Sequence, residues 1–131
     1  MPFEIRHEIV LDNVTLAETE VNSDFTVTRT VTMTEDMVLA ADVTIYADRA
    51  PFPLADGATV RGTLVGEGNV NIDGDGYDLT LEDKLKLKNL TLKDEGSEWI
   101  KIALGATVAF EDVTYNPDDL NDDDGTLVID P

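Results

Sequence analysis

The stretch NIDGDGYDLTLE, residues 71–82, gathers oxygen-bearing side chains of the kind that bind a hard metal ion. A twelve-residue calcium loop places its ligands at positions 1, 3, 5, 7, 9 and 12 and a glycine at position 6. Gly76 falls at the glycine position. The candidate ligands are Asn71, Asp73, Asp75, Asp78 and Glu82. This spacing predicts a site for structural Ca²⁺ held by carboxylate oxygens.

The residues flanking this stretch favour strands over the helices that enclose such a calcium loop. Apolar residues alternate with polar ones on both sides, at Val70, Ile72, Leu79 and Leu81. Gly74 and Gly76 are suited to a tight reversal of the chain. A plain corner between two strands, in a hairpin or a solenoid, is therefore the alternative to a calcium site.

Other residue types that carry out catalysis are scarce. His7 is the single histidine and there is no cysteine, so nucleophile–histidine pairs and zinc sites built on several imidazoles are excluded. With 28 acidic residues, some pair of carboxylates will lie at the separation a glycosidase uses, so a pair alone indicates nothing. We expect no enzymatic activity and no required cofactor. The alternative of a small polysaccharide-active enzyme would depend on carboxylates or Arg61.

Basic residues are concentrated in one short segment. Lys84, Lys86, Lys88 and Lys93 lie within ten residues. They could pair with acidic neighbours on adjacent strands, or they could dock on an acidic partner. Trp99, the only tryptophan, is a second interface candidate, with packing beneath a loop as its alternative.

Charge restricts the partners of the chain. The formal net charge of -19 repels nucleic acid phosphates and anionic lipid, so we expect neither nucleic acid nor membrane as a partner. In about 1 M salt the Debye length falls to about 3 Å, and long-range self-repulsion nearly vanishes. This acidic, lysine-poor composition resembles that of proteins from extreme halophiles, haloarchaea and their viruses. No apolar run approaches the length of a membrane span, and MPFEIRHEIV lacks a signal-peptide pattern, so we expect a soluble protein that begins near Met1.

Period-two alternation runs through most of the chain and indicates an all-β protein. The run FTVTRTVTMT predicts one continuous strand with threonines on one face. Its other face would carry Phe25, Val27, Arg29, Val31 and Met33.

A motif of two alternating apolar residues, a polar pair and two more alternating apolar residues occurs three times. The copies are IVLDNVTL, LKLKNLTL and VAFEDVTY, with Asn13, Asn89 and Asp112 closing the polar pair. Because the apolar positions on either side of that pair are three residues apart, a flat strand cannot keep them on one face. Asn and Asp tolerate left-handed backbone angles, so the motif predicts strand, corner, strand.

The second and third copies lie 23 residues apart, which fits one coil of a β-solenoid. The segment GATV also recurs at 57–60 and 105–108, before a predicted strand each time. Residues 37–116 resemble the coils of right-handed parallel β-helix proteins, the pectate-lyase-like family and its relatives in adhesins and viral fibres. The alternative architecture is an antiparallel β-sandwich.

We expect residues 1–131 to form a single domain. Its coils would span 37–116, residues 1–34 would form a strand-rich cap or arm, and the acidic segment 117–131 would protect the other end, because open strand edges invite further pairing.

The resulting hypothesis is a non-enzymatic structural protein located in a virion, as a capsid decoration, turret or fibre-base component of a haloarchaeal virus. Its partners would be itself and an acidic capsid or surface protein, and the resemblance to viral β-helical proteins implies a trimer or similar cluster. The alternative is a cell-surface or secreted carbohydrate-binding module that uses the threonine face and the aromatic residues Tyr46, Phe52, Tyr77 and Trp99.

Overall fold

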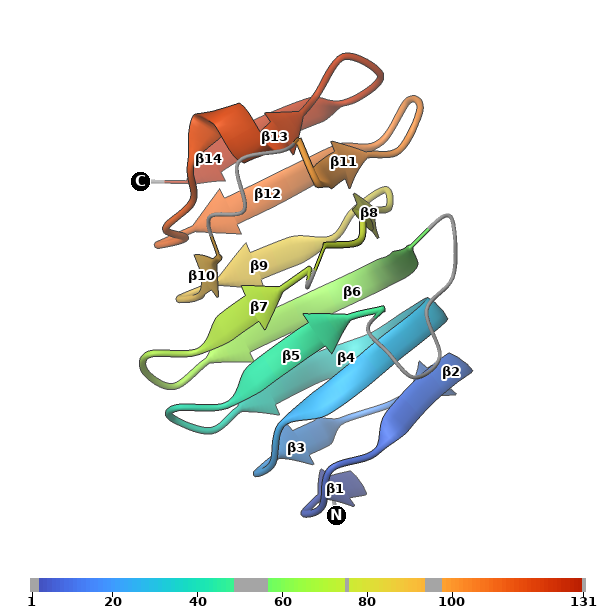
Figure 1. Ribbon diagram of the computed structural model, residues 1–131, viewed down its shortest axis with the longest axis vertical. Coiled ribbons are helices and arrows are strands. Elements are labelled where there is room, and N and C mark those ends of the chain that lie inside the picture. The colour runs from blue at the N-terminus through green and yellow to red at the C-terminus, as the bar shows by residue number, and fades with distance from the viewer. Residues whose placement is uncertain (1–2, 49–56, 75, 94–97, 131) are drawn as a thin grey trace.

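The computed structural model describes residues 3–48, 57–74, 76–93 and 98–130. Every strand pair in these ranges is parallel, and the strands form one continuous sheet. The sheet winds into a single parallel β-solenoid of about six turns, with the two ends of the chain at opposite ends of the stack (Figure 1). Each turn passes through three ladders of parallel strands, which enclose the core.

The first ladder holds the strands that open each turn. Along the solenoid it contains the first half of β2 (Val10–Leu16), the first part of β4 (Phe25–Leu39), β5 (Thr44–Ala47), β7 (Asn71–Asp73) and β10 (Thr91–Leu92). An isolated bridge between Thr91 and Thr114 adds the last rung. Four buried side chains share one register position on successive strands: Phe25, Ile45, Ile72 and Leu92.

The second ladder follows after a corner. It contains the second half of β2, the middle of β4, the first half of β6 (Ala58–Gly66), β8 (Leu79–Leu81), β11 (Ile100–Ile102) and β13 (Leu120–Asn121). A short 3₁₀ turn, η1 (Pro117–Asp119), precedes β13. The inward column of this ladder includes Val31, Val60, Leu81 and Ile102.

The third ladder closes each turn and is the longest. It contains β1 (Phe3–Ile5), β3 (Thr19–Val21), the ends of β4 and β6, β9 (Lys86–Lys88), β12 (Thr107–Glu111) and β14 (Thr126–Asp130). Its inward column includes Met37, Leu64, Leu87 and Phe110. Since parallel strands lie about 4.8 Å apart, each apolar side chain is buried between the residues one rung below and one rung above it.

The three predicted corners are confirmed. Asn13, Asn89 and Asp112 have positive φ angles of 54°, 57° and 53°. Leu87 pairs with Phe110, so the spacing of 23 residues is one turn of the solenoid, as expected. The first copy of the motif differs in place, because Asn13 separates the first ladder from the second, whereas the other two residues connect the third ladder to the first.

The flat strand predicted for FTVTRTVTMT is partly wrong. Arg29 does not share a face with Val27 and Val31, because it has a positive φ of 56° and an exposed side chain. The register against β2 shifts at this point. Arg29 therefore marks the same corner as Asn13, and its guanidinium donates to Asp12 on the preceding turn at 2.7 and 2.8 Å.

Parallel pairing also extends beyond the expected coil range of 37–116. Strands β1 to β4, within residues 3–34 and beyond, belong to the same ladders, and β13 and β14 of the acidic segment 117–131 form the last turn. The alternative of an antiparallel β-sandwich is wrong, since the pairs are parallel. Within the described part of the chain, no helix is long and apolar enough to cross a membrane.

Candidate functional site

The predicted calcium stretch forms a corner of the solenoid. It leaves the first ladder at β7 and enters the second at β8, so the solenoid corner weighed as the alternative describes its backbone. Asp75 lies outside the described residues. Elsewhere in the described ranges, no group of three or more His, Asp or Glu side chains is placed to hold a metal ion.

The acidic residues around this corner pair with different cations. Asp73 lies 3.0 Å from the ammonium of Lys93, and Asp78 lies 2.8 Å from that of Lys101. Glu82 lies 3.7 Å from the guanidinium of Arg61. Asn71 is on β7, in register with Thr44 and Thr91 on adjacent turns. Calcium binding at Asn71, Asp73, Asp75, Asp78 and Glu82 stays a prediction.

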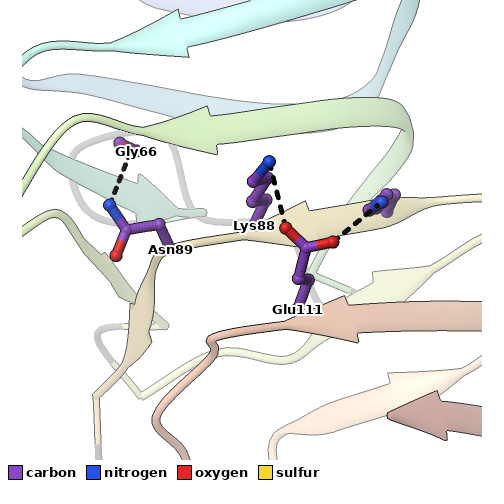
Figure 2. Close-up of polar contacts among 5 residues, drawn as sticks. Gly66, Lys88, Asn89 and Glu111 are labelled. Carbon is purple, nitrogen blue, oxygen red and sulfur yellow. Dashed lines mark hydrogen bonds and ion pairs between the residues drawn. The ribbon is translucent and has the colours of Figure 1, made fainter. Parts of the chain in front are cut away.

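The lysine cluster is organised by the third ladder. Lys86 and Lys88 project from β9 toward Glu111 on β12, one turn away, with Nζ to carboxylate distances of 3.4 and 3.0 Å (Figure 2). The hydrogen bond from Lys88 lowers the pKa of the Glu111 carboxyl, and the same bond raises the pKa of Lys88. Lys84 lies at the preceding corner with a φ of 69°, so it is not part of the strand.

Trp99 packs in the interior of the solenoid. Its side chain is 1% exposed, directly before β11, and its backbone oxygen accepts from the amide of Leu79. The indole N–H is buried and has no hydrogen-bond partner in the described structure. An indole buried in this way packs within its own chain, as the alternative interpretation of Trp99 expected, and its surface is not presented to a partner.

A polar hollow lies on the outer face of the first ladder. It has a volume of about 360 Å³ and is lined by Thr44, Tyr46, Asn71, Asp73 and Lys93. These residues come from β5 and β7 and from the position directly after β10, on three successive turns. The charge pattern of the sequence did not indicate this hollow, because its lining residues are 20 or more residues apart and become neighbours only when the turns stack.

A second hollow lies on the outer face of the third ladder, toward the N-terminal end. Its volume is about 200 Å³, and its lining residues are Glu18, Thr19, Glu20, Val21, Asn22, Val38 and Glu67. Three of these seven residues are carboxylates, and one is an apolar residue on the strand face. The hollow is therefore shaped and charged to receive a cationic group.

The ends of the solenoid expose apolar side chains. Val128 and Ile129 on β14 are 42% and 56% exposed, and Phe3 on β1 and Val10 on β2 are 53% and 44% exposed at the other end. In the described structure, β1 and β14 each pair with one neighbour only, so the outer edge of each strand carries backbone groups without a strand partner.

These features define the chain as a parallel β-solenoid with two open ends. Comparisons with protein-family models, with curated proteins and with solved structures found no match. The solenoid fold is thus the part of the resemblance to parallel β-helix proteins that is confirmed, and no family is identified.

Proposed function

We propose that the chain is a non-enzymatic structural protein of a larger assembly, as a capsid decoration, turret or fibre-base component of a haloarchaeal virus. Its partners are further copies of itself and an acidic capsid or surface protein. The observation that carries the proposal is the pair of open solenoid ends, where strand edges and apolar side chains are exposed together. Exposed edges of this kind pair with other chains unless they are covered.

The acidic surface supports the high-salt setting of this proposal. A net charge of -19 opposes close packing of many copies in dilute buffer. In molar salt the repulsion acts only over about 3 Å, so contacts through the apolar ends become favourable. The number of copies in the assembly, a trimer by resemblance, is an expectation that the test below also measures.

The test is mass spectrometry of gradient-purified particles from the native source. We expect this chain to sediment with a major capsid protein in a fixed ratio. Particles rebuilt with the Ile129→Gln variant should carry fewer copies, because that change makes the end surface polar. The matched control is Leu104→Gln, which changes a leucine that is 86% exposed at a corner away from the ends. Absence of the chain from particles would refute the proposal.

A carbohydrate-binding module is the second candidate function, and the hollow on the first ladder favours it. Tyr46 supplies an aromatic ring, while Asn71, Asp73 and Lys93 supply hydrogen-bonding groups of the types that bind sugar hydroxyls. Glycan-array binding in molar KCl would support this function if Tyr46→Ala abolished it and Lys101→Ala, outside the hollow, did not. Silence across neutral and acidic glycans would count against it.

A further inference from the structure

The outer face of the third ladder has an ordered column of charge. Residues at one outward register position on seven successive strands are Glu4, Glu20, Val38, Val65, Lys88, Glu111 and Asp130. The order from the N-terminal end is acidic, then apolar, then basic, and then acidic again. The neighbouring outward column repeats part of this order, with Asp36, Thr63 and Lys86 on successive turns.

The acidic part of this face contains the hollow of about 200 Å³ described above. Glu20 is exposed, and neither Glu20 nor Glu67 forms an ion pair with a described cation. Val38 lines the same hollow and is partly buried. The hollow therefore offers uncompensated negative charge beside an apolar surface.

The basic part of the face lies two to three rungs further along. The side chains of Lys86 and Lys88 remain 36% and 46% exposed although both contact Glu111. Two ammonium groups share one carboxylate there, so this part keeps one positive charge in excess (Figure 2). Val65 lies on the strand between the hollow and the lysines.

We propose that this face binds a second copy of the same chain in an antiparallel arrangement, about a two-fold axis between Val38 and Val65. Such an axis places each residue of the column opposite one at the mirrored rung. Val38 of one copy then meets Val65 of the other. Lys88 meets Glu20, and Lys86 meets Glu18, which directly precedes β3 and lines the hollow.

The pattern is self-complementary, and it would not be so in a parallel arrangement. If the two solenoids ran in the same direction about an axis along the stack, Lys88 would face Lys88 and Glu20 would face Glu20. Like charges placed opposite each other destabilise a contact and exclude that partner geometry. The acid, apolar, base order therefore selects the antiparallel homodimer, as an isologous interface requires.

The size of the face predicts a weak dimer. Six overlapping rungs at a spacing of about 4.8 Å, with strands of about five residues, give a contact of about 24 by 17 Å, or about 400 Å² per partner. This is smaller than the standard stable interface of about 800 Å² per partner. The dimer should therefore form at high protein concentration or within an assembly, and more readily in molar salt, where the net repulsion of the two copies is screened.

The test is sedimentation equilibrium of the full chain over a wide concentration range in 2 M KCl. We expect a monomer–dimer equilibrium for the wild type. Lys88→Glu and Glu20→Lys should each weaken dimerisation by about tenfold, since each change affects two symmetric contacts. The double variant Lys88→Glu with Glu20→Lys should restore it. Lys101→Glu on the second ladder is the matched control and should leave the dissociation constant unchanged.

Thermal unfolding of each variant separates loss of contact from loss of fold. Rescue by the double variant supports the proposal, because that variant lacks the contact between Lys88 and Glu111 and regains only the charge pattern between copies. A wild type that is monomeric at all concentrations, a trimer, or equal weakening by Lys101→Glu would overturn it. None of these results depends on whether the chain is found in virus particles.

Discussion

Replacing Asn89 tests how the corners of this solenoid are stabilised. Asn89 joins the third ladder to the first with a φ of 57°, and its side-chain amide donates to the backbone oxygen of Gly66 on the previous turn at 2.8 Å (Figure 2). The residue therefore does two things, since it tolerates the left-handed backbone and it satisfies a buried carbonyl. Alanine removes both contributions, whereas glycine removes only the hydrogen bond.

The two contributions have separate magnitudes. Loss of the hydrogen bond should cost about 1 kcal/mol, and more if the Gly66 oxygen is left without a partner. A left-handed conformation costs an L-residue without a short polar side chain about 1–2 kcal/mol. Asn89→Ala should therefore lower the free energy of unfolding by about 2–3 kcal/mol. Asn89→Gly has no strain but increases the backbone entropy of the unfolded chain, so it should be about 1 kcal/mol less destabilising than alanine.

Urea unfolding with circular dichroism measures both variants. The matched control is Asn71, which lies on strand β7 and has no positive φ. At Asn71 the order should reverse, because glycine in a strand is more costly than alanine there. The same order at both positions would refute the reasoning, as would an Asn89→Ala variant as stable as the wild type. The slope of the unfolding transition should be unchanged, because the fold is the same.

Three further predictions concern the core and the charges. Leu87→Ala should cost about 2–5 kcal/mol, because the side chain is buried between Leu64 and Phe110. Leu104→Ala, at an exposed position, should change stability by less than about 0.5 kcal/mol in the same urea assay. Because Lys88 lowers the pKa of Glu111 from its usual 4.5, this pair adds stability above that pH and loses it as the pH falls through the folded pKa. Lys88→Met should thus lower the unfolding temperature at pH 7 more than at pH 3, and equal losses would contradict this. Finally, the unfolding temperature should rise steeply from about 0.1 to 3 M KCl, and a flat response would contradict the high-salt interpretation.

Much of the fold was predictable because the corners have a local cause. Asn and Asp at the centre of an apolar spacing of three indicate a bend from residues within one motif, and Asn89 and Asp112 have that bend. The period of 23 residues then follows from two copies of the motif, and the pairing of Leu87 with Phe110 confirms it. Such signals are readable because neither requires knowledge of the rest of the chain.

Corners without this local signal were missed. Arg29 keeps period-two alternation with Val27 and Val31, so nothing in its own segment predicts a bend. Its left-handed conformation is explained by the preceding turn, where Asn13 sets the corner and Asp12 accepts from the guanidinium. The structural cause of the bend is thus one turn away in the sequence, where period-based interpretation does not reach.

The candidate sites were harder to predict for the same reason. Asp73 and Asp78 are five residues apart and suggest one metal site by spacing, yet they pair with Lys93 and Lys101 on the next turn. A carboxylate on a solenoid has neighbours above and below as well as along its strand, and those neighbours come from positions 20 to 25 residues away. In a chain with 28 acidic and nine basic residues, the basic residues therefore determine which acidic residues are compensated between turns. The acidic residues beyond their reach, Glu20 and Glu67 among them, keep their charge available, and that is why the proposed contact between copies places lysines opposite the acidic hollow that Glu20 and Glu67 help to line.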